Sequence, residues 1–418
     1  MKQRVLIVGA GWDQLPIIRE AHRLGHFVVA VDGNPHACGL KEADASAVIS
    51  TRDAEGVFRT AEAFSVDAIT SMITESPLEA IQQAATQLGL PASSRLSIEA
   101  TTSKVRMREV FAAAGLPDVR FGCARTQAEA TRIAAEIGFP LVMKSADVGG
   151  QLGLFRIDGP GAVEPAFADA QHHSVQGSVI FEELLLGPEL NVVAVVLDGN
   201  ICALTVSDRI KHPREAFGIV QRHLYPADCS SAEHAAVVEL CQHAVSALEI
   251  RNAIIFPQLI LTSSGPRLVE TGERIPGGVM KELFELATGI DLVRLQLDIA
   301  FGAVRALEDY CCHPKHEAVT VKFLTARPGP LVPGRVATVH GRKAALSIPG
   351  VVETQFYNDP QQPQEIRPLR NARDRFYFVI AVGNERDEVL ETSDRAAELL
   401  DFRDADKRSL LERKNRAA

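Results

Sequence analysis

The first 95 residues alternate regularly between short apolar runs and longer amphipathic segments. The apolar runs are rich in Val, Ile and Leu, which is typical of strands buried on both faces of a parallel sheet. The amphipathic segments have helical spacing, and one opens with Ser76 and Pro77, a common helix start. The strand candidates are RVLIV (4–8), FVVAVD (27–32), ASAVIS (45–50) and VDAITSM (66–72). This alternation predicts an α/β fold that begins with a doubly wound parallel sheet.

The turn after the first strand, GAGWDQ (9–14), begins like a dinucleotide-binding fingerprint. Gly9 and Gly11 are present, and Asp32 ends the second strand candidate. Gln14, however, stands where Gly or Ala would let the following helix pack closely. The turn therefore predicts a tight connection in a Rossmann-like domain. An NAD-binding oxidoreductase is an alternative that rests on this turn alone.

Composition narrows the class of partner. The chain has 418 residues and a formal net charge of −9, and no block of Lys and Arg gives it the footprint of a nucleic-acid-binding protein. No apolar run reaches the roughly 18–20 residues of a membrane span. The seven cysteines are scattered, which fits reduced thiols better than a disulfide framework. We therefore expect a cytoplasmic protein that acts on small molecules, with neither nucleic acid nor membrane as a partner.

A lysine precedes a glycine-rich turn in MKSADVGGQLGLF (143–155). Lys144 ends a strand-like run, and Gly149, Gly150 and Gly153 lie in the turn. Glycines let backbone N–H groups face an anion, and a lysine supplies a point charge to a phosphate. The segment is no Walker A motif, because no G-K-[ST] follows. It indicates either a phosphate-binding loop or an ordinary glycine hairpin with an exposed lysine.

Two later segments place carboxylates beside strands. FEELLLGPEL (181–190) is suited to bind a purine nucleotide through carboxylates and backbone groups, with Glu189 near a ribose hydroxyl; a charged linker is the alternative. The hairpin AIIFPQLILTSSGPRLVET (253–271) carries Glu270 next to its last residue, and Arg274 follows. An apolar strand that turns abruptly into charge and glycine is typical of a strand that delivers polar groups to a site.

The order of these pieces resembles the ATP-grasp superfamily over about residues 100–280. Lys104 opens a helix, Lys144 precedes the glycine loop, the glutamate-rich segment follows a strand, and the hairpin ends in VETGER (269–274). The details are most similar to carboxylate–amine ligases of the L-amino acid ligase type. Supporting stretches are LGLPASS (88–94), RHLYPADC (222–229) and ATGIDLVRL (287–295).

This resemblance implies an ATP-grasp fold in three domains. A Rossmann-like domain would span residues 1–97, and the ATP-grasp domain would span residues 98–300, with a lid over about 110–182. A small α+β domain would follow at 301–418.

The resemblance also implies roles by position. Groups around ATP would be Lys104 and Lys144 at the phosphates, the loop with Gly149, Gly150 and Gly153 as a lid, Glu182, Glu183 and Leu185 at the adenine, and Glu189 at the ribose. Glu270 would hold Mg²⁺, with Mn²⁺ as a substitute. Arg274 would be the catalytic cation that stabilises the charged intermediate.

The second metal ligand departs from the family pattern. The family usually places a glutamate on the opposing hairpin strand, and that position is Gln258 here; the expected asparagine is Gly272. An amide oxygen still suits Mg²⁺, which prefers hard oxygen donors. It brings one negative charge less, so the metal should bind more weakly or depend more on ATP oxygens. Glu273 is an alternative ligand, but strand alternation turns it away from Arg274, and we expect it to face solvent.

Substrate-binding groups are expected in SDRIKHPREAFGIVQRHLYP (207–226), a long segment rich in Arg and His; a solvated surface loop is the alternative. The candidates in it for a substrate carboxylate are Arg209, His212, Arg214 and His223. Glu75, at a strand end of the first domain, is a candidate for a substrate amine. Gly277, in the glycine pair after Arg274, is a further substrate candidate.

Together these features predict an ATP-dependent ligase. It would activate a small carboxylate, such as an amino acid, as an acyl phosphate, couple it to an amine, and release ADP and phosphate. A homodimer is expected by analogy with the family. A biotin-carboxylase-like ligase is a weaker alternative, because Gln258 and Gly272 replace residues that this group is expected to carry. A nucleotide-binding protein that kept the fold and lost catalysis is a further alternative, because Gln258 removes a metal-binding charge.

Overall fold

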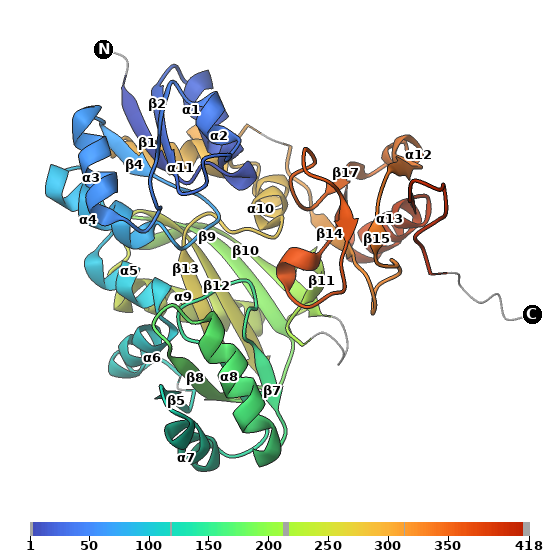
Figure 1. Cartoon of the computed structure of the whole chain (residues 1–418), viewed down its shortest axis with the longest axis horizontal. Helices are drawn as coiled ribbons and strands as arrows, with labels where there is room; N and C mark the ends of the chain where they lie inside the picture. Colours follow the sequence, from blue (N-terminus) through green and yellow to red (C-terminus); the bar gives the residue numbers. More distant parts are fainter. Residues whose placement is uncertain (1–2, 118, 212–216, 313, 413–418) are drawn as a thin grey trace, which may run out of the picture.

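A parallel sheet in the order β3–β2–β1–β4 begins the computed structural model, which describes residues 3–117, 119–211, 217–312 and 314–412. Its strands are β1 (Arg4–Val8), β2 (Phe27–Asp32), β3 (Ala45–Val48) and β4 (Ala68–Thr70). One face packs against α3 (Ala54–Ala63) and α4 (Leu78–Leu88), and the other against α1 (Leu15–Arg23) and α11 (Leu292–Phe301) (Figure 1). The predicted doubly wound parallel sheet is confirmed, and α11 returns to it from late in the chain.

An antiparallel sheet of eight strands forms the centre of the molecule. Its order is β13–β12–β9–β10–β11–β14–β19–β17. Five strands belong to the central part of the chain, namely β9 (Glu189–Leu197), β10 (Asn200–Lys211), β11 (Val220–Tyr225), β12 (Ala253–Thr262) and β13 (Gly265–Glu273). The helix α9 (Ser231–Ala247) packs on one face of this part, and α10 (Met280–Thr288) lies on the other.

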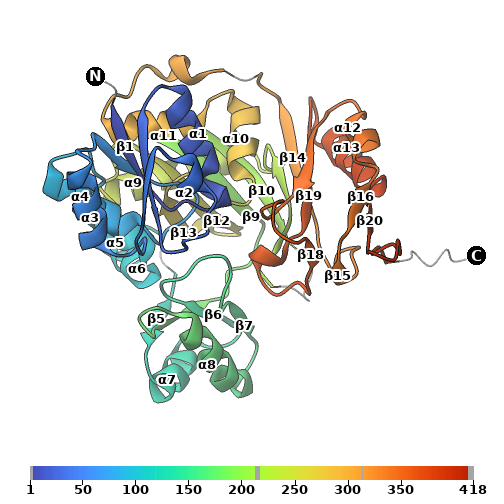
Figure 2. The same cartoon turned by 45° about the horizontal axis from the view of Figure 1, so that its top comes forward.

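A second antiparallel sheet, in the order β5–β8–β6–β7, projects from the rest of the molecule (Figure 2). Its elements are β5 (Phe121–Ala124), α7 (Gln127–Ile137), β6 (Leu141–Ser145), β7 (Phe155–Ile157), α8 (Val163–His173) and β8 (Val179–Glu183). The helices α7 and α8 and the sheet bury a core of their own. The helices α5 (Arg95–Thr102) and α6 (Lys104–Ala113) connect this unit to the N-terminal sheet.

The last hundred residues extend the central sheet. The strand β14 (Ala318–Leu324) pairs with β11, and β19 (Tyr377–Gly383) and β17 (Val351–Phe356) follow. The remaining elements are α12 (Arg342–Leu346), α13 (Arg386–Glu398) and the short strands β15 (Gly334–Arg335), β16 (Thr338–His340), β18 (Glu365–Ile366) and β20 (Asp401–Arg403). The expected α+β composition of this region is present, and the three domain boundaries stay a prediction.

Two boundaries differ from the expectation. The spacing of apolar residues predicts helix over 278–304; this segment contains two helices, α10 and α11, because Gly289 takes a positive φ and Asp291 caps the second. The sequence also predicts a final helix from about residue 391, and this helix, α13, begins five residues earlier, at Arg386. Among the described residues, no helix is long and apolar enough to cross a membrane.

Candidate active site

A cavity of about 1060 Å³ lies where the N-terminal sheet, the projecting unit, the central sheet and the C-terminal strands meet. It brings together predicted site residues from every part of the chain, namely Glu75, Lys104, Lys144, Gly149, Gly150, Glu182, Glu183, Leu185, Glu189, Arg209, His223, Gln258, Glu270, Arg274 and Gly277. Gly153 does not line the cavity; a Cβ there would lie 2.6 Å from Ser145 Oγ, so it allows close packing beneath the loop. His212 and Arg214 fall outside the described residues.

A buried ion triad stands at one wall. Lys144 is the last residue but one of β6. Val142, two residues before it, pairs with Glu182 on β8, so the side chains of Lys144 and Glu182 emerge on the same face. Nζ of Lys144 and Nε of Arg108 each lie 2.7 Å from a different carboxylate oxygen of Glu182. Burial opposes the charge on Glu182, but Arg108 and Lys144 lower its pKa to about 2. Each carboxylate oxygen of Glu182 is therefore paired with a buried cation.

Arg108 links this triad to the hairpin that carries the metal candidates. The pairing of β12 with β13 contains a β-bulge. Gln258 pairs with Glu270 and Leu259 pairs with Leu268, so Val269 is an extra residue on β13. The carbonyl oxygens of Leu268 and Val269 accept hydrogen bonds from Arg108, at 2.7 and 3.0 Å. The bulge therefore sets the orientation of the residue that follows it, Glu270.

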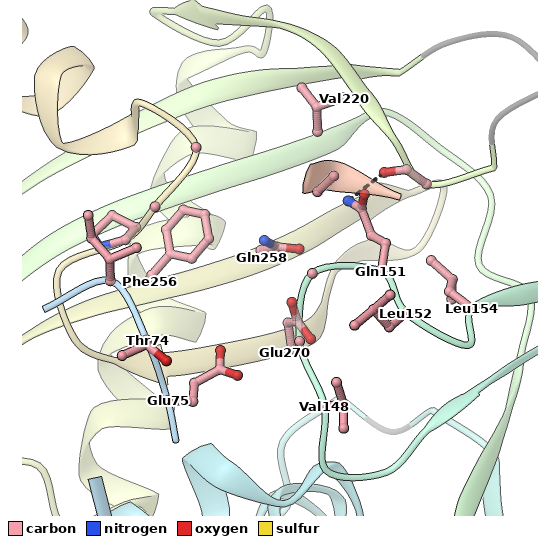
Figure 3. Close-up of a pocket in the computed structure, with 18 of the residues that line it drawn as sticks. Thr74, Glu75, Val148, Gln151, Leu152, Leu154, Val220, Phe256, Gln258 and Glu270 are labelled. Atoms are coloured by element: carbon pink, nitrogen blue, oxygen red, sulfur yellow. Dashed lines mark hydrogen bonds between the residues drawn. The ribbon is translucent and has the colours of Figure 1, made fainter. Parts of the chain in front are cut away.

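Gln258 and Glu270 are direct partners across the two strands of the hairpin. Figure 3 shows both side chains reaching into the cavity, with Glu75 beside them and the glycine loop opposite. They supply an amide oxygen and a carboxylate. Among the described residues, no group of three or more His, Cys, Asp or Glu side chains is placed to hold a metal ion.

The glycine loop lies along another side of the cavity. Nζ of Lys104 donates to the carbonyl of Val148 at 2.9 Å, which joins the start of α6 to the loop. Gly149 fits closely against Glu75, because a Cβ there would lie 2.8 Å from a carboxylate oxygen. Gly150 takes a φ of +75°, and among the described residues the backbone N–H groups of Gly149 and Gly150 donate to no acceptor. Free N–H groups of this kind suit an anion.

Arg274 and Glu75 form an ion pair across the cavity, with Nη2 of Arg274 2.5 Å from Oε1 of Glu75. A backbone hydrogen bond from Ile73 to Ile275 brings the two segments side by side. Burial opposes the charge on Glu75, but Arg274 and Lys104 lower its pKa below the usual value. The Nε atom of Arg274 is buried and has no partner among the described residues, so this cation keeps a free donor.

Glu189 accepts ion pairs from Arg209 and Lys211 on the adjacent strand β10. Arg209 also donates to the carbonyl of Gly218, at 2.8 Å. The side chain of Arg209 is thereby committed to the predicted ribose-binding residue, although Arg209 is the direct cross-strand partner of His223. It remains a candidate for substrate binding only by its position on the cavity wall.

His223 lies deep in the cavity wall. Its Nδ1 is 2.9 Å from the amide nitrogen of Asn191, which can only donate. Burial lowers the pKa of His223 well below its usual range, and the charges of Arg375 and Arg209 lower it further. The ring is therefore neutral near pH 7, with its proton on Nε2.

Glu273 differs from the expectation. It points away from the cavity, as strand alternation predicts, but it is buried and does not face solvent. Its carboxylate accepts hydrogen bonds from Ser93 and Ser97. Burial raises its pKa even though these two hydroxyls lower it. Glu273 therefore holds the start of α5 against β13.

The turn GAGWDQ leaves little room for a dinucleotide. The side-chain oxygen of Gln14 accepts from the N–H of Gly11, at 3.1 Å, and its amide donates to Met72 at 2.9 Å. The N–H of Ala10 donates to Asp32, at 2.8 Å. The groups that would bind a pyrophosphate and a ribose are already engaged, so this turn does not favour the NAD alternative.

Sequence reasoning missed two cationic residues of the cavity, Arg108 and Arg375. Arg108 carries a usable signal, since it follows Lys104 by one helical turn on α6 and so shares its face. Arg375 carries none: it lies just before β19, far along the chain from every motif. Only the pairing of β14 with β11 brings its part of the chain to the site.

Two family models match the chain. The model of the carbamoyl-phosphate synthase L chain, ATP-binding domain, matches residues 103–307, and the model of L-amino acid ligase C-terminal domain 2 matches residues 322–405. The first covers the residues that build the cavity's phosphate and metal candidates. The resemblance to the ATP-grasp superfamily is thereby confirmed, with residues 103–307 matching the ATP-binding domain. The C-terminal region of the chain is of the L-amino acid ligase type.

Similar proteins agree with this assignment. An L-amino acid ligase from Bacillus licheniformis superimposes with a TM-score of 0.78 at 19% identity, over 96% of this chain and 98% of that one. An alanine–anticapsin ligase of Bacillus subtilis is 23% identical over 61% of this chain and 58% of its own. An uncharacterised protein of Sinorhizobium fredii is 27% identical over 82% and 70%. The predicted ATP-grasp fold is confirmed, and the relatives of this chain include ATP-dependent ligases.

Proposed function

We propose that this ATP-grasp protein is an ATP-dependent ligase that joins a small carboxylate to an amine through an acyl phosphate. The observation that carries the proposal is the shared cavity. Lys104, Lys144 and the glycine loop line it together with the Gln258–Glu270 pair and the Arg274–Glu75 pair. Groups suited to bind a nucleoside triphosphate thus line the same cavity as groups suited to bind a carboxylate and an amine.

ATP would lie between the projecting unit and the hairpin. Lys144 and Lys104 would offset the charge of its phosphates, and the free N–H groups of Gly149 and Gly150 would donate to them. The adenine would meet the backbone around Leu185, and the ribose would meet Glu189, which is oriented by its two cations. The loop 149–153 would close over the phosphates and exclude water from the acyl phosphate.

Mg²⁺ fits the hairpin as a partner of ATP. Gln258 and Glu270 offer two hard oxygen donors at directly paired positions, and Mg²⁺ commonly takes one or two protein ligands and completes its shell with phosphates and water. When bound, the ion would neutralise charge on the transferring phosphoryl group. The donor set carries only one negative charge, so we expect occupancy to depend on the nucleotide.

The chemistry then follows from the charges of this chain. The substrate carboxylate attacks the γ-phosphorus, ADP leaves, and an acyl phosphate forms. The free amine attacks the acyl carbon, phosphate departs, and the proton that the amine loses passes to the departing phosphate or to water. Arg274 would lie beside this point, where its permanent charge and free Nε–H would stabilise the tetrahedral oxyanion and the leaving phosphate. Glu75 would orient Arg274 and attract the ammonium form of the amine.

Phosphate release from Mg-ATP tests the proposal, with amino acids supplied singly and in pairs. Release that requires both an acid and an amine, with a condensed product by mass spectrometry, would support a ligase. Absence of release for every pair, while ATP still raises the melting temperature, would favour a nucleotide-binding protein without catalysis. Gln258 is the observation that supports this second candidate, because it removes one metal-binding charge.

A further inference from the structure

Arg375 is a buried cation without an acidic partner. Its side chain is 94% buried in the wall of the cavity, since its exposed fraction is 6%. Of the five lysines and arginines that are buried in the described part of the chain, Arg108, Lys144, Arg209 and Arg222 each form an ion pair. Arg375 forms none with any described residue. A buried charge is costly unless it is paired, so an unpaired one in a cavity indicates an anion that binds there.

The surroundings of Arg375 fix the guanidinium and leave part of it free. Its Cζ lies 4.3 Å from the ring centroid of Phe323 and 4.4 Å from that of Tyr357, two rings that stand perpendicular to each other. Nε donates to the carbonyl of Ala372, at 2.9 Å, and Nη2 donates to the hydroxyl of Tyr357, at 2.5 Å. These contacts hold the cation, and they leave Nη1 without a protein acceptor among the described residues.

A gap in the wall separates this cation from His223. Gly278 lies between them: a Cβ there would come within 3.5 Å of Nη2 of Arg375 and 3.9 Å of Nε2 of His223. Gly278 has a φ of +70°, which a larger residue rarely adopts, so the space stays open. The neutral His223 directs its Nε2–H to the same place. A charged donor and a neutral donor thus converge on one position, which is suited to a carboxylate.

We propose that Arg375 and Nε2 of His223 bind a substrate carboxylate that is not phosphorylated. The inference deepens the proposed ligase function and rests on it, because the bound carboxylate belongs to a substrate only if the protein is a ligase. The carboxylate has two possible sources, the amine substrate when it is itself an amino acid, and a second carboxyl group on the acid. The site therefore assigns at least one anionic amino acid or dicarboxylate to the pair of substrates, and it disfavours a pair of simple monoacid and alkyl amine.

The first test needs only the unmodified full chain. The melting temperature is measured with Mg²⁺ and a non-hydrolysable ATP analogue, with each L-amino acid compared with its amide and each small dicarboxylate with its monoamide. We expect at least one carboxylate to stabilise the protein where its amide does not. The amino acid arm and the dicarboxylate arm distinguish the two sources. Equal stabilisation by acids and amides, or by none of them, would overturn the proposal.

The second test uses Arg375→Gln, with Arg251→Gln as a matched control. Arg251 is a surface residue whose side chain is 77% exposed. The concentration of the carboxylate that gives half the thermal shift should rise at least about 30-fold in Arg375→Gln and stay unchanged in the control. Arg375→Lys should recover part of the loss, because it keeps the charge. Unchanged carboxylate binding in a variant that still binds the ATP analogue would refute the site.

These readouts separate the two proposals. If acids are distinguished from amides but no pair of substrates releases phosphate, the ligase function fails and the anion site stands. If phosphate is released by a pair of substrates but Arg375→Gln leaves the half-saturating concentration unchanged, the ligase function stands and the anion site fails.

Discussion

At the scale of single residues, Gln258 decides how firmly the hairpin holds a metal. Gln258 faces Glu270 directly, and Lys144 lies near enough to Glu270 for the two charges to interact. A single carboxylate next to a buried lysine attracts a divalent ion only weakly. The phosphates of ATP must therefore supply much of the negative charge.

We expect Gln258→Glu to tighten Mg²⁺ binding about tenfold, because a second carboxylate joins the site. Without metal, the new charge repels Glu270, so the melting temperature should fall, and Mg²⁺ should restore it. Both effects are measurable by titrating Mg²⁺ in a thermal unfolding assay. Gln83→Glu adds the same charge on the exposed side of α4 and should do neither. A metal response identical to that of the unmodified chain would place position 258 outside the metal shell.

Arg274→Ala should lower the rate of phosphate release about 10²- to 10³-fold, the usual cost of losing one group that stabilises an oxyanion. Binding of the ATP analogue should persist, because Lys104, Lys144 and the glycine loop are untouched. Arg267→Ala removes an arginine from the same strand, outside the cavity, and is the control. Synthesis at the normal rate in Arg274→Ala would contradict the role proposed for this residue.

At the scale of elements, the Arg108–Glu182 pair connects three segments that are far apart in the sequence. Arg108 on α6 contacts Glu182 on β8 and the bulge of β13. The same pair orients Lys144 on β6. The pair therefore sets the position of the projecting unit relative to the metal hairpin, as well as the charge at the phosphates.

This connection predicts a specific dependence of stability on pH. The folded pKa of Glu182, about 2, lies below its ordinary value of 4.5, so its contribution is present above about pH 4.5 and is lost as pH falls toward 2. The shift corresponds to about 3 kcal/mol. Glu182→Gln should remove this slope and lower the free energy of unfolding at pH 7 by about 3–5 kcal/mol, because two buried cations lose their partner.

Denaturant unfolding at several pH values measures both effects. Glu183→Gln is the matched control, since Glu183 pairs with an arginine whose side chain is 64% exposed, and it should cost less than about 1 kcal/mol. An equal loss of unfolding free energy in the two variants would show that the buried triad stabilises the protein no more than the exposed ion pair of Glu183.

At the scale of the whole molecule, one core connects all parts except the projecting unit. A single cluster of buried residues includes side chains from β1, α11, β9, α10, β14 and β19. The projecting unit buries a separate cluster between its own sheet and α7 and α8. The chain thus consists of a large body and a smaller unit, joined through α5, α6 and the ion triad.

This division predicts local motion at the glycine loop. Mg²⁺ with an ATP analogue should slow amide hydrogen exchange in residues 147–154, because the free N–H groups there would bind phosphate. Exchange in α12, on the C-terminal side of the molecule, should stay unchanged. Hydrogen exchange followed by mass spectrometry measures both, and equal rates in the loop with and without nucleotide would contradict its role as a lid.

The sequence was informative wherever local patterns define an element or a motif. Alternating apolar runs predicted the N-terminal sheet, and the order of Lys144, the glycine loop and the hairpin predicted the ATP-grasp fold. The same order pointed to Arg274 and to Gln258 with Glu270. The roles of these residues remain predictions that the experiments above address.

The sequence could not show which polar residues become buried together. Strand alternation predicts on which side of the strand Glu273 lies, but it does not predict which element covers that side. The side chain of Glu273 was expected to face solvent, and the start of α5 covers it. No local sequence pattern marks Arg375. It stands out only in the folded structure, where it is buried in the cavity wall without an acidic partner among the described residues.

By itself, the sequence determined the kinds of elements and their order, since these follow from periodicity along one chain, and its motifs carried the resemblance to the ATP-grasp superfamily. The tertiary structure alone decided how charges pair. The continuation of the central sheet into β14 and β19 brings Arg375 to the cavity, and Arg108 contacts both the bulge of β13 and Glu182 on β8. Ion pairing depends on distances of a few ångströms between residues far apart in the chain, and only the folded structure sets those distances.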